Sequence, residues 1–187
     1  MMKDKTNFSN IVGIAGQIGS GKTSLAKELC KRLNWQLISF GSFVRSEANR
    51  RGLKIERAAL QQLGENLISE FGPAEFVRQV LCSNKPFSNI VIDGIRHVEI
   101  WQAIQSVAQK GILVYLDVPE EVRIARLHER DDSDIDSIKL AMLHPMGKNI
   151  YLLRQYSNLV LFDETIESMV AQVMALFVDK CLPLLRI

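Results

Sequence analysis

Eight residues near the start of the chain have the types and spacing of a phosphate-binding loop. Their sequence, Gly-Gln-Ile-Gly-Ser-Gly-Lys-Thr, fits the pattern G-x-x-x-x-G-K-[S/T]. Glycines allow a positive φ and let backbone N–H groups approach a polyphosphate closely. We expect Lys22 to reach the terminal phosphates of a nucleoside triphosphate and the Thr23 hydroxyl to bind the accompanying Mg²⁺. The residues predicted to bind the nucleotide are Gly16, Gln17, Ile18, Gly19, Ser20, Gly21, Lys22 and Thr23.

The segments on either side of the loop have the patterns that this motif needs. Residues 11–15 form a short apolar run typical of a buried strand, and apolar residues repeat at helical spacing over residues 23–33. A helix that begins at the loop adds the positive end of its dipole to the phosphate site. The alternative is a chance glycine-rich turn. The full pattern in this context predicts a bound nucleoside triphosphate, although it does not identify the reaction.

An aspartate at the end of a later strand is the second candidate element. Residues 89–93 form an apolar run that ends at Asp93. In P-loop proteins, a carboxylate at the end of a neighbouring strand helps to organise the magnesium ion. We therefore expect Thr23 and Asp93 to form the metal site. The alternative is that Asp93 only caps the helix expected over residues 97–109.

Three arginines are predicted to share one face of a helix. Residues 111–118 predict a strand, and Pro119 followed by two glutamates is a favourable helix start. On this helix Arg123, Arg126 and Arg130 follow one another at i, i+3 and i+7. Beside a phosphate site they could clamp a transferring phosphoryl group, and the alternative is an ordinary solvated helix face. The position directly after a predicted strand favours the phosphate interpretation.

Strand patterns and helical patterns alternate along the chain, which is typical of an α/β fold with a parallel sheet covered by helices on both faces. Two further strands are expected over residues 36–40 and 158–162, and an amphipathic helix is expected from Thr165 onward. Residues 41–82 show only helical patterns, the first over 43–51. This segment is long enough to be a substrate-covering insert rather than a simple crossover.

Length and composition limit the class of protein. The 187 residues, 47% of them hydrophobic, predict a single domain over residues 1–187. A net charge of +2 is too small to indicate a nucleic-acid partner. No segment approaches the run of about 18 apolar residues that a membrane helix needs, and three widely separated cysteines predict neither disulfides nor a zinc site. Because the N-terminal segment lacks the apolar core of a signal peptide, we expect a cytoplasmic protein.

Together these features resemble the nucleoside monophosphate kinase group of P-loop kinases over most of the chain. The resemblance is carried by the loop, by residues 38–45 (Ile-Ser-Phe-Gly-Ser-Phe-Val-Arg), by residues 91–96 (Val-Ile-Asp-Gly-Ile-Arg) and by the helix with the three arginines. Residues 38–45 look like the segment that ends on an arginine for the acceptor phosphate, which implies this role for Arg45. Residues 91–96 are similar to the Asp-Gly-Phe-Pro-Arg stretch of adenylate kinases. This similarity implies that Asp93 and Arg96 also face the acceptor.

The same resemblance implies a three-layer α/β/α fold with a five-stranded parallel sheet. It also implies a helical acceptor-binding insert over about residues 41–82 and a short lid over about residues 126–147. Arg126 and Arg130 match the lid arginines of these kinases in spacing. The catalytic residues implied are Lys22, Arg96, Arg126 and Arg130.

Several positions depart from the adenylate kinase pattern. Ser42 and Phe40 stand where adenylate kinases often have Asp and Thr, Ile95 replaces the proline before the arginine, and the short lid has no cysteines. These details look closer to a less characterised branch of bacterial, archaeal and phage kinases with the sequence I-D-G-I-R. The loop sequence G-I-G-S-G-K in turn resembles that of dephospho-coenzyme A kinases.

The function expected from these features is an ATP-dependent phosphotransferase that uses ATP and Mg²⁺. Its partner would be a small phosphorylated acceptor, a nucleoside or deoxynucleoside monophosphate, with no nucleic acid or membrane involved. One alternative is transfer to a ribose hydroxyl, as in dephospho-coenzyme A kinase, for which Asp93 or Asp117 would have to act as a base. Another alternative is a nucleotide-binding adaptor without turnover.

Overall fold

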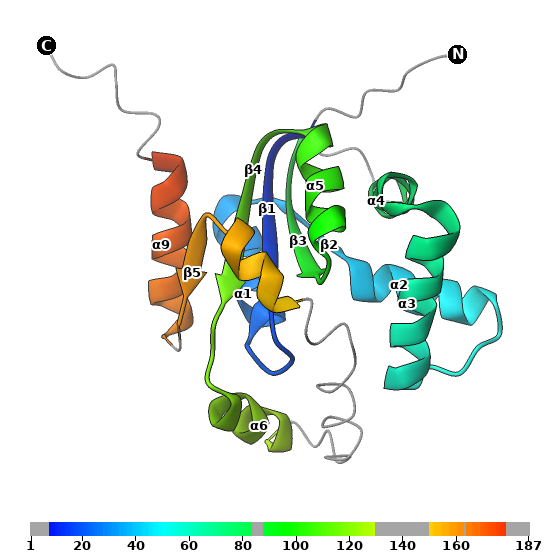
Figure 1. Cartoon of the computed structure of the whole chain (residues 1–187). Helices are drawn as coiled ribbons and strands as arrows, with labels where there is room; N and C mark the ends of the chain where they lie inside the picture. Colours follow the sequence, from blue (N-terminus) through cyan, green and yellow to red (C-terminus); the bar gives the residue numbers. More distant parts are fainter. Residues whose placement is uncertain (1–7, 84–87, 130–149, 163, 179–187) are drawn as a thin grey trace, which may run out of the picture.

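The computed structural model of the chain describes residues 8–83, 88–129, 150–162 and 164–178 (Figure 1). Its centre is a five-stranded sheet in the order β2-β3-β1-β4-β5, in which all neighbouring strands are parallel. The strands are β1 (Phe8–Gly16), β2 (Gln36–Ser39), β3 (Asn89–Ile95), β4 (Ala108–Leu116) and β5 (Leu159–Leu161). This sheet and the helices on its two faces confirm the predicted three-layer fold.

The central strand β1 is apolar on both faces because both faces are covered. Ile11 and Ala15 belong to one hydrophobic cluster, whereas Val12 and Ile14 belong to another on the opposite face, and all four are fully buried. The helix α5 (Val98–Val107) packs on the first face, while α1 (Lys22–Leu33) and α9 (Ile166–Val178) pack on the second (Figure 1). An alternating polar and apolar strand could not fill both layers.

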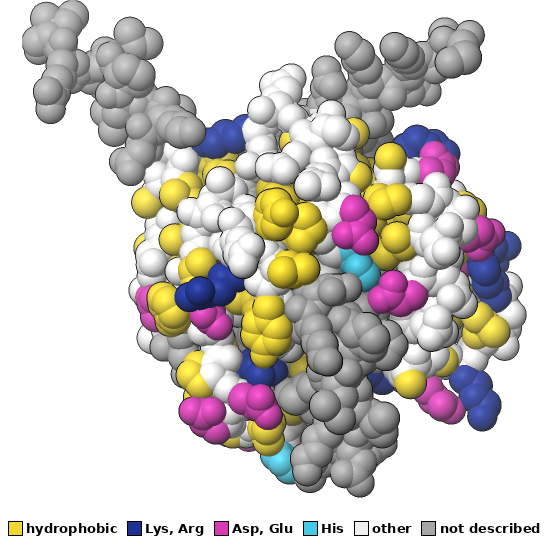
Figure 2. Space-filling model, viewed as in Figure 1, with side chains coloured by type: hydrophobic (Ala, Val, Ile, Leu, Met, Phe, Trp, Pro, Cys, Tyr) yellow, Lys and Arg dark blue, Asp and Glu magenta, His cyan; other side chains and the backbone are white. Residues whose placement is uncertain are grey.

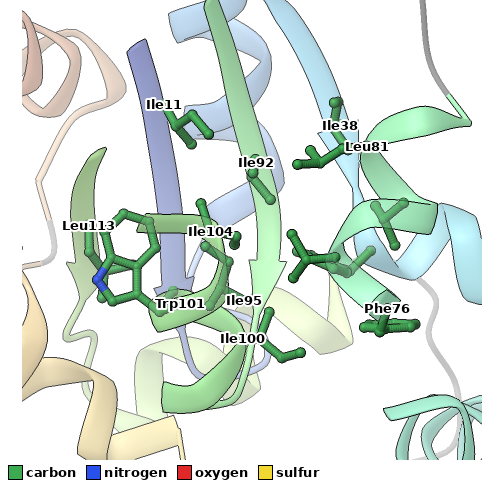
Figure 3. Close-up of a cluster of buried hydrophobic side chains, with 14 of the residues drawn as sticks. Ile11, Ile38, Phe76, Leu81, Ile92, Ile95, Ile100, Trp101, Ile104 and Leu113 are labelled. Carbon is green, nitrogen blue, oxygen red and sulfur yellow. The ribbon is translucent and has the colours of Figure 1, made fainter. Parts of the chain in front are cut away.

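A glycine in β1 makes room for the largest side chain of the core. Trp101 of α5 is fully buried and belongs to the hydrophobic cluster that Figure 3 shows. A Cβ atom on Gly13 would lie 2.8 Å from the Trp101 ring, so only glycine permits this close packing. Trp101 is therefore a central residue of the hydrophobic core.

Three helices between β2 and β3 form the expected insert. They are α2 (Phe40–Arg50), α3 (Arg57–Phe71) and α4 (Pro73–Cys82), and they lie beside the sheet next to α5 (Figure 1). Phe40 and Phe76 stack at 5.5 Å between ring centroids and join this insert to the main hydrophobic cluster. The remaining elements are α6 (Glu120–His128) and the short 3₁₀ helix η1 (Leu153–Tyr156).

Several boundaries differ from the sequence prediction by a few residues, and two of the differences have a clear physical cause. Phe40 begins α2 instead of ending β2, because Ser39 caps the helix by accepting a hydrogen bond from the Ser42 N–H at 3.3 Å. The helix expected over residues 97–109 ends at Val107, and Ala108 already pairs with β1. In each case a long-range or capping contact decided where the helix begins or ends.

Most of the predicted lid, residues 130–147, lies outside the described part of the chain. None of the helices that the structure describes combines the length and the apolar character that a membrane span requires. On the face seen in Figure 2, the basic side chains are scattered and several stand beside acidic ones, so this face carries no continuous basic patch.

Candidate active site

The phosphate-binding loop connects β1 to α1 as the sequence predicted. Gly19 has a φ of +80°, and a Cβ atom there would lie 2.6 Å from the backbone oxygen of Arg123, so glycine is required for both conformation and space. The Lys22 ammonium group donates hydrogen bonds to the Gln17 carbonyl oxygen at 2.5 Å and to Ser20 Oγ at 3.4 Å. It therefore lies against the loop, where the phosphates of a nucleotide would be bound.

Thr23 and Asp93 meet beside this loop. The Thr23 hydroxyl donates a hydrogen bond of 2.7 Å to Asp93 Oδ2, although the two residues are 70 positions apart. Asp93 is 7% exposed, and its other oxygen, Oδ1, is buried without a hydrogen-bond partner among the described residues.

The residues at this point fit a magnesium ion that is bound partly by phosphates and water. A hydroxyl and a carboxylate with a spare oxygen are hard oxygen ligands of the kind that Mg²⁺ prefers. The described part of the chain contains no group of three or more His, Cys, Asp or Glu side chains that could hold an ion by itself. Mg²⁺ seldom uses such all-protein cages in nucleotide sites.

Arg123 does not share the position of the other helix arginines. It is 3% exposed, its Nε donates to the Val118 carbonyl oxygen, and its Nη1 donates to the Ile18 carbonyl oxygen, both at 3.1 Å. Its Nη2 lies 3.8 Å from a carboxylate oxygen of Glu120. Arg123 thus connects α6 to the phosphate-binding loop through buried hydrogen bonds. The sequence had instead suggested a position beside the transferring phosphoryl group.

Arg126 lies on the loop side of α6, one turn further along. A Cβ atom built on Gly21 would be 3.9 Å from Arg126 Nη1, so this half-buried guanidinium group stands next to the loop. Arg130, the next arginine of the predicted set, lies outside the described residues.

A cleft of about 700 Å³ extends from the loop toward the helical insert. Its walls come from the loop, from the start of α2, from α3 and from the end of β3. Four cationic side chains and one carboxylate line it, and these residues are Lys22, Arg45, Arg57, Arg96 and Asp93. The cleft therefore brings the predicted donor and acceptor residues into one cationic space.

The cations of the cleft act on one another. Burial, and then repulsion from the Arg57 guanidinium, lowers the pKa of Arg96, while the Asp93 carboxylate acts in the opposite direction. Among the described residues, Arg45 and Arg96 form no ion pair or hydrogen bond through their side chains. Positive groups held together in this way favour the binding of an anion with more than one charge.

Two residues of the cleft were not singled out from the sequence, namely Arg57 and Gln61 on α3. Arg57 is the first residue of that helix. A cation there opposes the helix dipole, so its presence at a helix start was a signal that could have been used. Gln61 follows one turn later and points along the same face.

Comparison with known proteins places this geometry in a family. Residues 15–140 match the family model described as AAA domain. A UPF0200 protein of Pyrobaculum aerophilum is 33% identical over 150 residues, which cover 80% of this chain and 78% of the relative. A cytidylate kinase of Desulfurococcus amylolyticus is 30% identical over 146 residues, which cover 77% of this chain and 68% of the relative.

Solved structures share the fold at lower identity. Shikimate kinase of Acinetobacter baumannii, in complex with shikimate, superposes with a TM-score of 0.58 at 16% identity, over 96% of this chain and 98% of that one. The family match implies that the protein uses ATP. The chain therefore belongs to the AAA domain family and, among the P-loop kinases, to the nucleoside monophosphate kinase-like group.

Proposed function

We propose that the protein transfers the γ-phosphoryl group of ATP to the phosphate of a nucleoside or deoxynucleoside monophosphate. The bond from the γ-phosphorus to the bridging oxygen of ADP would break as a bond to an acceptor phosphate oxygen forms. ADP and a nucleoside diphosphate are the products. The observation that carries the proposal is that Arg45, Arg57 and Arg96 line the same cleft as Lys22.

The donor half of the site would consist of the loop and the magnesium residues. Lys22 and the loop N–H groups would bind the β- and γ-phosphates, and Thr23 with Asp93 would hold Mg²⁺, which neutralises charge on the phosphates. Arg126, with Arg130 beyond the described segment, would cover the transferring group from α6 and help to exclude water. Little covalent help is needed, because phosphoryl transfer depends on positioning and charge stabilisation.

The acceptor half would consist of the three arginines that line the cleft. Arg45 and Arg96 would bind the acceptor phosphate, and Arg57, which repels Arg96, would add a third positive charge. Relief of that repulsion by a phosphate dianion would contribute to acceptor binding. The cytidylate kinase among the relatives is consistent with such an acceptor.

Transfer to a hydroxyl group is less well supported by the contacts of the two candidate bases. Asp93 already accepts a hydrogen bond from Thr23, and Asp117 Oδ2 lies 2.9 Å from Nε of Arg154. A base must reach the hydroxyl proton of its substrate. The phosphate oxygen of a monophosphate needs no such group, since it is already ionised near neutral pH.

The proposal is tested by ADP release from MgATP with a panel of acceptors. The panel contains the ribo- and deoxynucleoside monophosphates, dephospho-coenzyme A, shikimate and a blank. We expect ADP release with at least one monophosphate and a loss of about 100-fold or more in kcat for Lys22→Ala, because that side chain contacts the transferring group. We also expect Arg96→Ala to raise the KM of the acceptor far more than that of ATP.

Arg78→Ala provides the matched control for the arginine variant. Arg78 lies on α4, outside the cleft, and its guanidinium group is bonded to Glu75 on the surface. This variant should keep both KM values. ADP release only with dephospho-coenzyme A would show a hydroxyl acceptor, and ATP binding without turnover on any acceptor would show an adaptor. Either result would refute the proposed reaction.

A further inference from the structure

The helix α3 presents two different faces, and only one of them borders the cleft. Arg57 and Gln61 are four residues apart, which is about 6 Å along the helix axis, and both line the cleft. The neighbouring Gln62 is exposed and donates a hydrogen bond to Asn66 Oδ1 at 3.0 Å. Two adjacent glutamines therefore have the same chemistry but opposite surroundings.

The side chain of Gln61 is a polar group in a cleft that also has apolar and aromatic lining residues. It is half-buried and has no hydrogen-bond partner among the described residues. Phe76, Ile68 and Ile100 line the same cleft, and the Phe76 ring stacks on Phe40 at an interplanar angle of 25°. A half-buried amide without a protein partner keeps its hydrogen-bonding groups available to a ligand in the cleft.

This combination suits a ring with a polar edge. Apolar walls favour a flat heterocycle over a polyhydroxylated sugar, and the amide offers one acceptor and two donor hydrogens. A molecule with a phosphate at one end and such a ring at the other could contact Arg57 and Gln61 together. A nucleoside monophosphate has this construction.

We propose that Gln61 binds the edge of the acceptor's nucleobase and thereby takes part in base recognition by the kinase. The inference rests on the proposed function and assigns a further residue to its acceptor site. The amide can pair with the amino group and ring nitrogen of cytosine or adenine. Turned over, it can pair with the keto group and N–H of uracil or guanine.

Replacing the Gln61 amide by a carboxylate removes the hydrogen-bond donors of the side chain and leaves only acceptors. A carboxylate only accepts hydrogen bonds, so it pairs best with an edge that carries two adjacent donors. Guanine has such an edge in its ring N–H and its amino group, whereas cytosine, uracil and adenine each place an acceptor beside a donor. Gln61→Glu should therefore shift the preference toward guanine.

The experiment measures kcat/KM for GMP, CMP, UMP and AMP with the full-length chain. In Gln61→Glu, the ratio of kcat/KM for GMP to that for CMP should rise by about tenfold or more, the factor expected for a hydrogen bond to a charged group. The new carboxylate could also pair with Arg57, four residues away, and weaken all acceptors equally. The ratio between bases is therefore the readout, because such a uniform loss cancels in it.

Gln61→Leu removes the hydrogen bonds without adding charge. Its kcat/KM for the preferred acceptor should fall by about tenfold, mainly through KM, and its Tm should stay near that of the wild type. Gln62→Glu is the matched control, since it is the same substitution on the outer face of the same helix. Its base ratios should stay within about twofold of the wild type.

The outcomes separate this inference from the function on which it rests. Base ratios that remain within twofold of the wild type in both Gln61 variants, while monophosphates are still phosphorylated, would overturn the role of Gln61 and leave the proposed reaction intact. Absence of turnover by the wild-type chain with every monophosphate would overturn the proposed reaction and the role of Gln61 together.

Discussion

The buried arginine of α6 offers a quantitative test of how the phosphate-binding loop keeps its shape. Arg123 donates to the carbonyl oxygens of Ile18 and Val118, both at 3.1 Å. Ile18 belongs to the loop, and its carbonyl group is turned toward α6 by this bond. We predict that Arg123→Met destabilises the fold and weakens ATP binding, because it releases that carbonyl group and frees the loop from α6.

The size of the effect follows from these two contacts. A hydrogen bond to a charged group contributes about 1.5–3 kcal/mol. Two bonds give about 3–6 kcal/mol, from which the cost of burying the guanidinium group must be subtracted. A net loss of about 3 kcal/mol in the free energy of unfolding is expected, which corresponds to a decrease of about 6–12 °C in Tm for a chain of this size. The loss in Arg123→Lys should lie between zero and the loss in Arg123→Met, because one ammonium group cannot reproduce the geometry of the planar guanidinium group.

The assays are thermal unfolding and the KM for ATP at saturating acceptor. We expect Arg123→Met to raise the KM for ATP and to leave the KM of the acceptor nearly unchanged. Arg78→Met is the control, since Arg78 is an exposed arginine outside the cleft whose loss should leave the Tm nearly unchanged. A variant of Arg123 with normal Tm and normal KM for ATP but a reduced kcat would refute this reasoning. That result would place Arg123 at the transferring phosphoryl group.

Two further predictions concern stability. Tyr115 is fully buried, its hydroxyl group has no hydrogen-bond partner among the described residues, and burial raises its pKa to about 12. Tyr115→Phe should therefore raise Tm by about 2–4 °C, equivalent to about 1 kcal/mol, and a lower Tm would show that the hydroxyl group is bonded. Hydrogen bonding to Arg50 lowers the pKa of Glu47 from 4.5 to about 2. The stabilising effect of the Glu47 carboxylate should be complete above pH 4.5 and decrease as the pH falls toward 2. The Tm values of the wild type and of Glu47→Gln should therefore converge over that interval. A constant difference between them would contradict the role of the Glu47–Arg50 pair.

The parts of the site that could be predicted from the sequence are those fixed by local geometry. The loop over residues 16–23 has its conformation determined by its own glycines and by the strand and helix beside it. The bond between Thr23 and Asp93 joins distant residues, yet each stands at the end of a recognisable strand or the start of a helix. Parallel strands bring such ends to one edge of the sheet, so their meeting could be expected.

Helical periodicity was less informative about the arginines of α6. The spacing of Arg123 and Arg126 places them near each other on the helix surface, but it does not say what that surface meets. The packing of α6 against the loop buries Arg123, which bonds to the Ile18 carbonyl oxygen, and leaves Arg126 beside Gly21. A shift of one helical turn separates a structural arginine from one that faces the nucleotide site.

The acceptor side depended on how the insert folds back, which sequence patterns alone do not specify. Arg57 and Gln61 reach the cleft because the stacked rings of Phe40 and Phe76 help to hold α2 and α4 together, and α3 packs between these two helices. These are contacts between residues far apart in the sequence. Amphipathic spacing predicted that α3 exists, but not which of its polar residues would enter the cleft.

The charge of the cleft connects its two halves. Asp93 is the only carboxylate among the described residues that line it, and this one group both accepts the hydrogen bond from Thr23 and favours the charged form of Arg96. The described residues that line the cleft carry more positive than negative groups, which favours anionic ligands. Asp93 also links the two sets of residues, because it bonds to Thr23 of the loop and acts on the charge of Arg96. Both features are what the proposed reaction between two phosphorylated substrates requires.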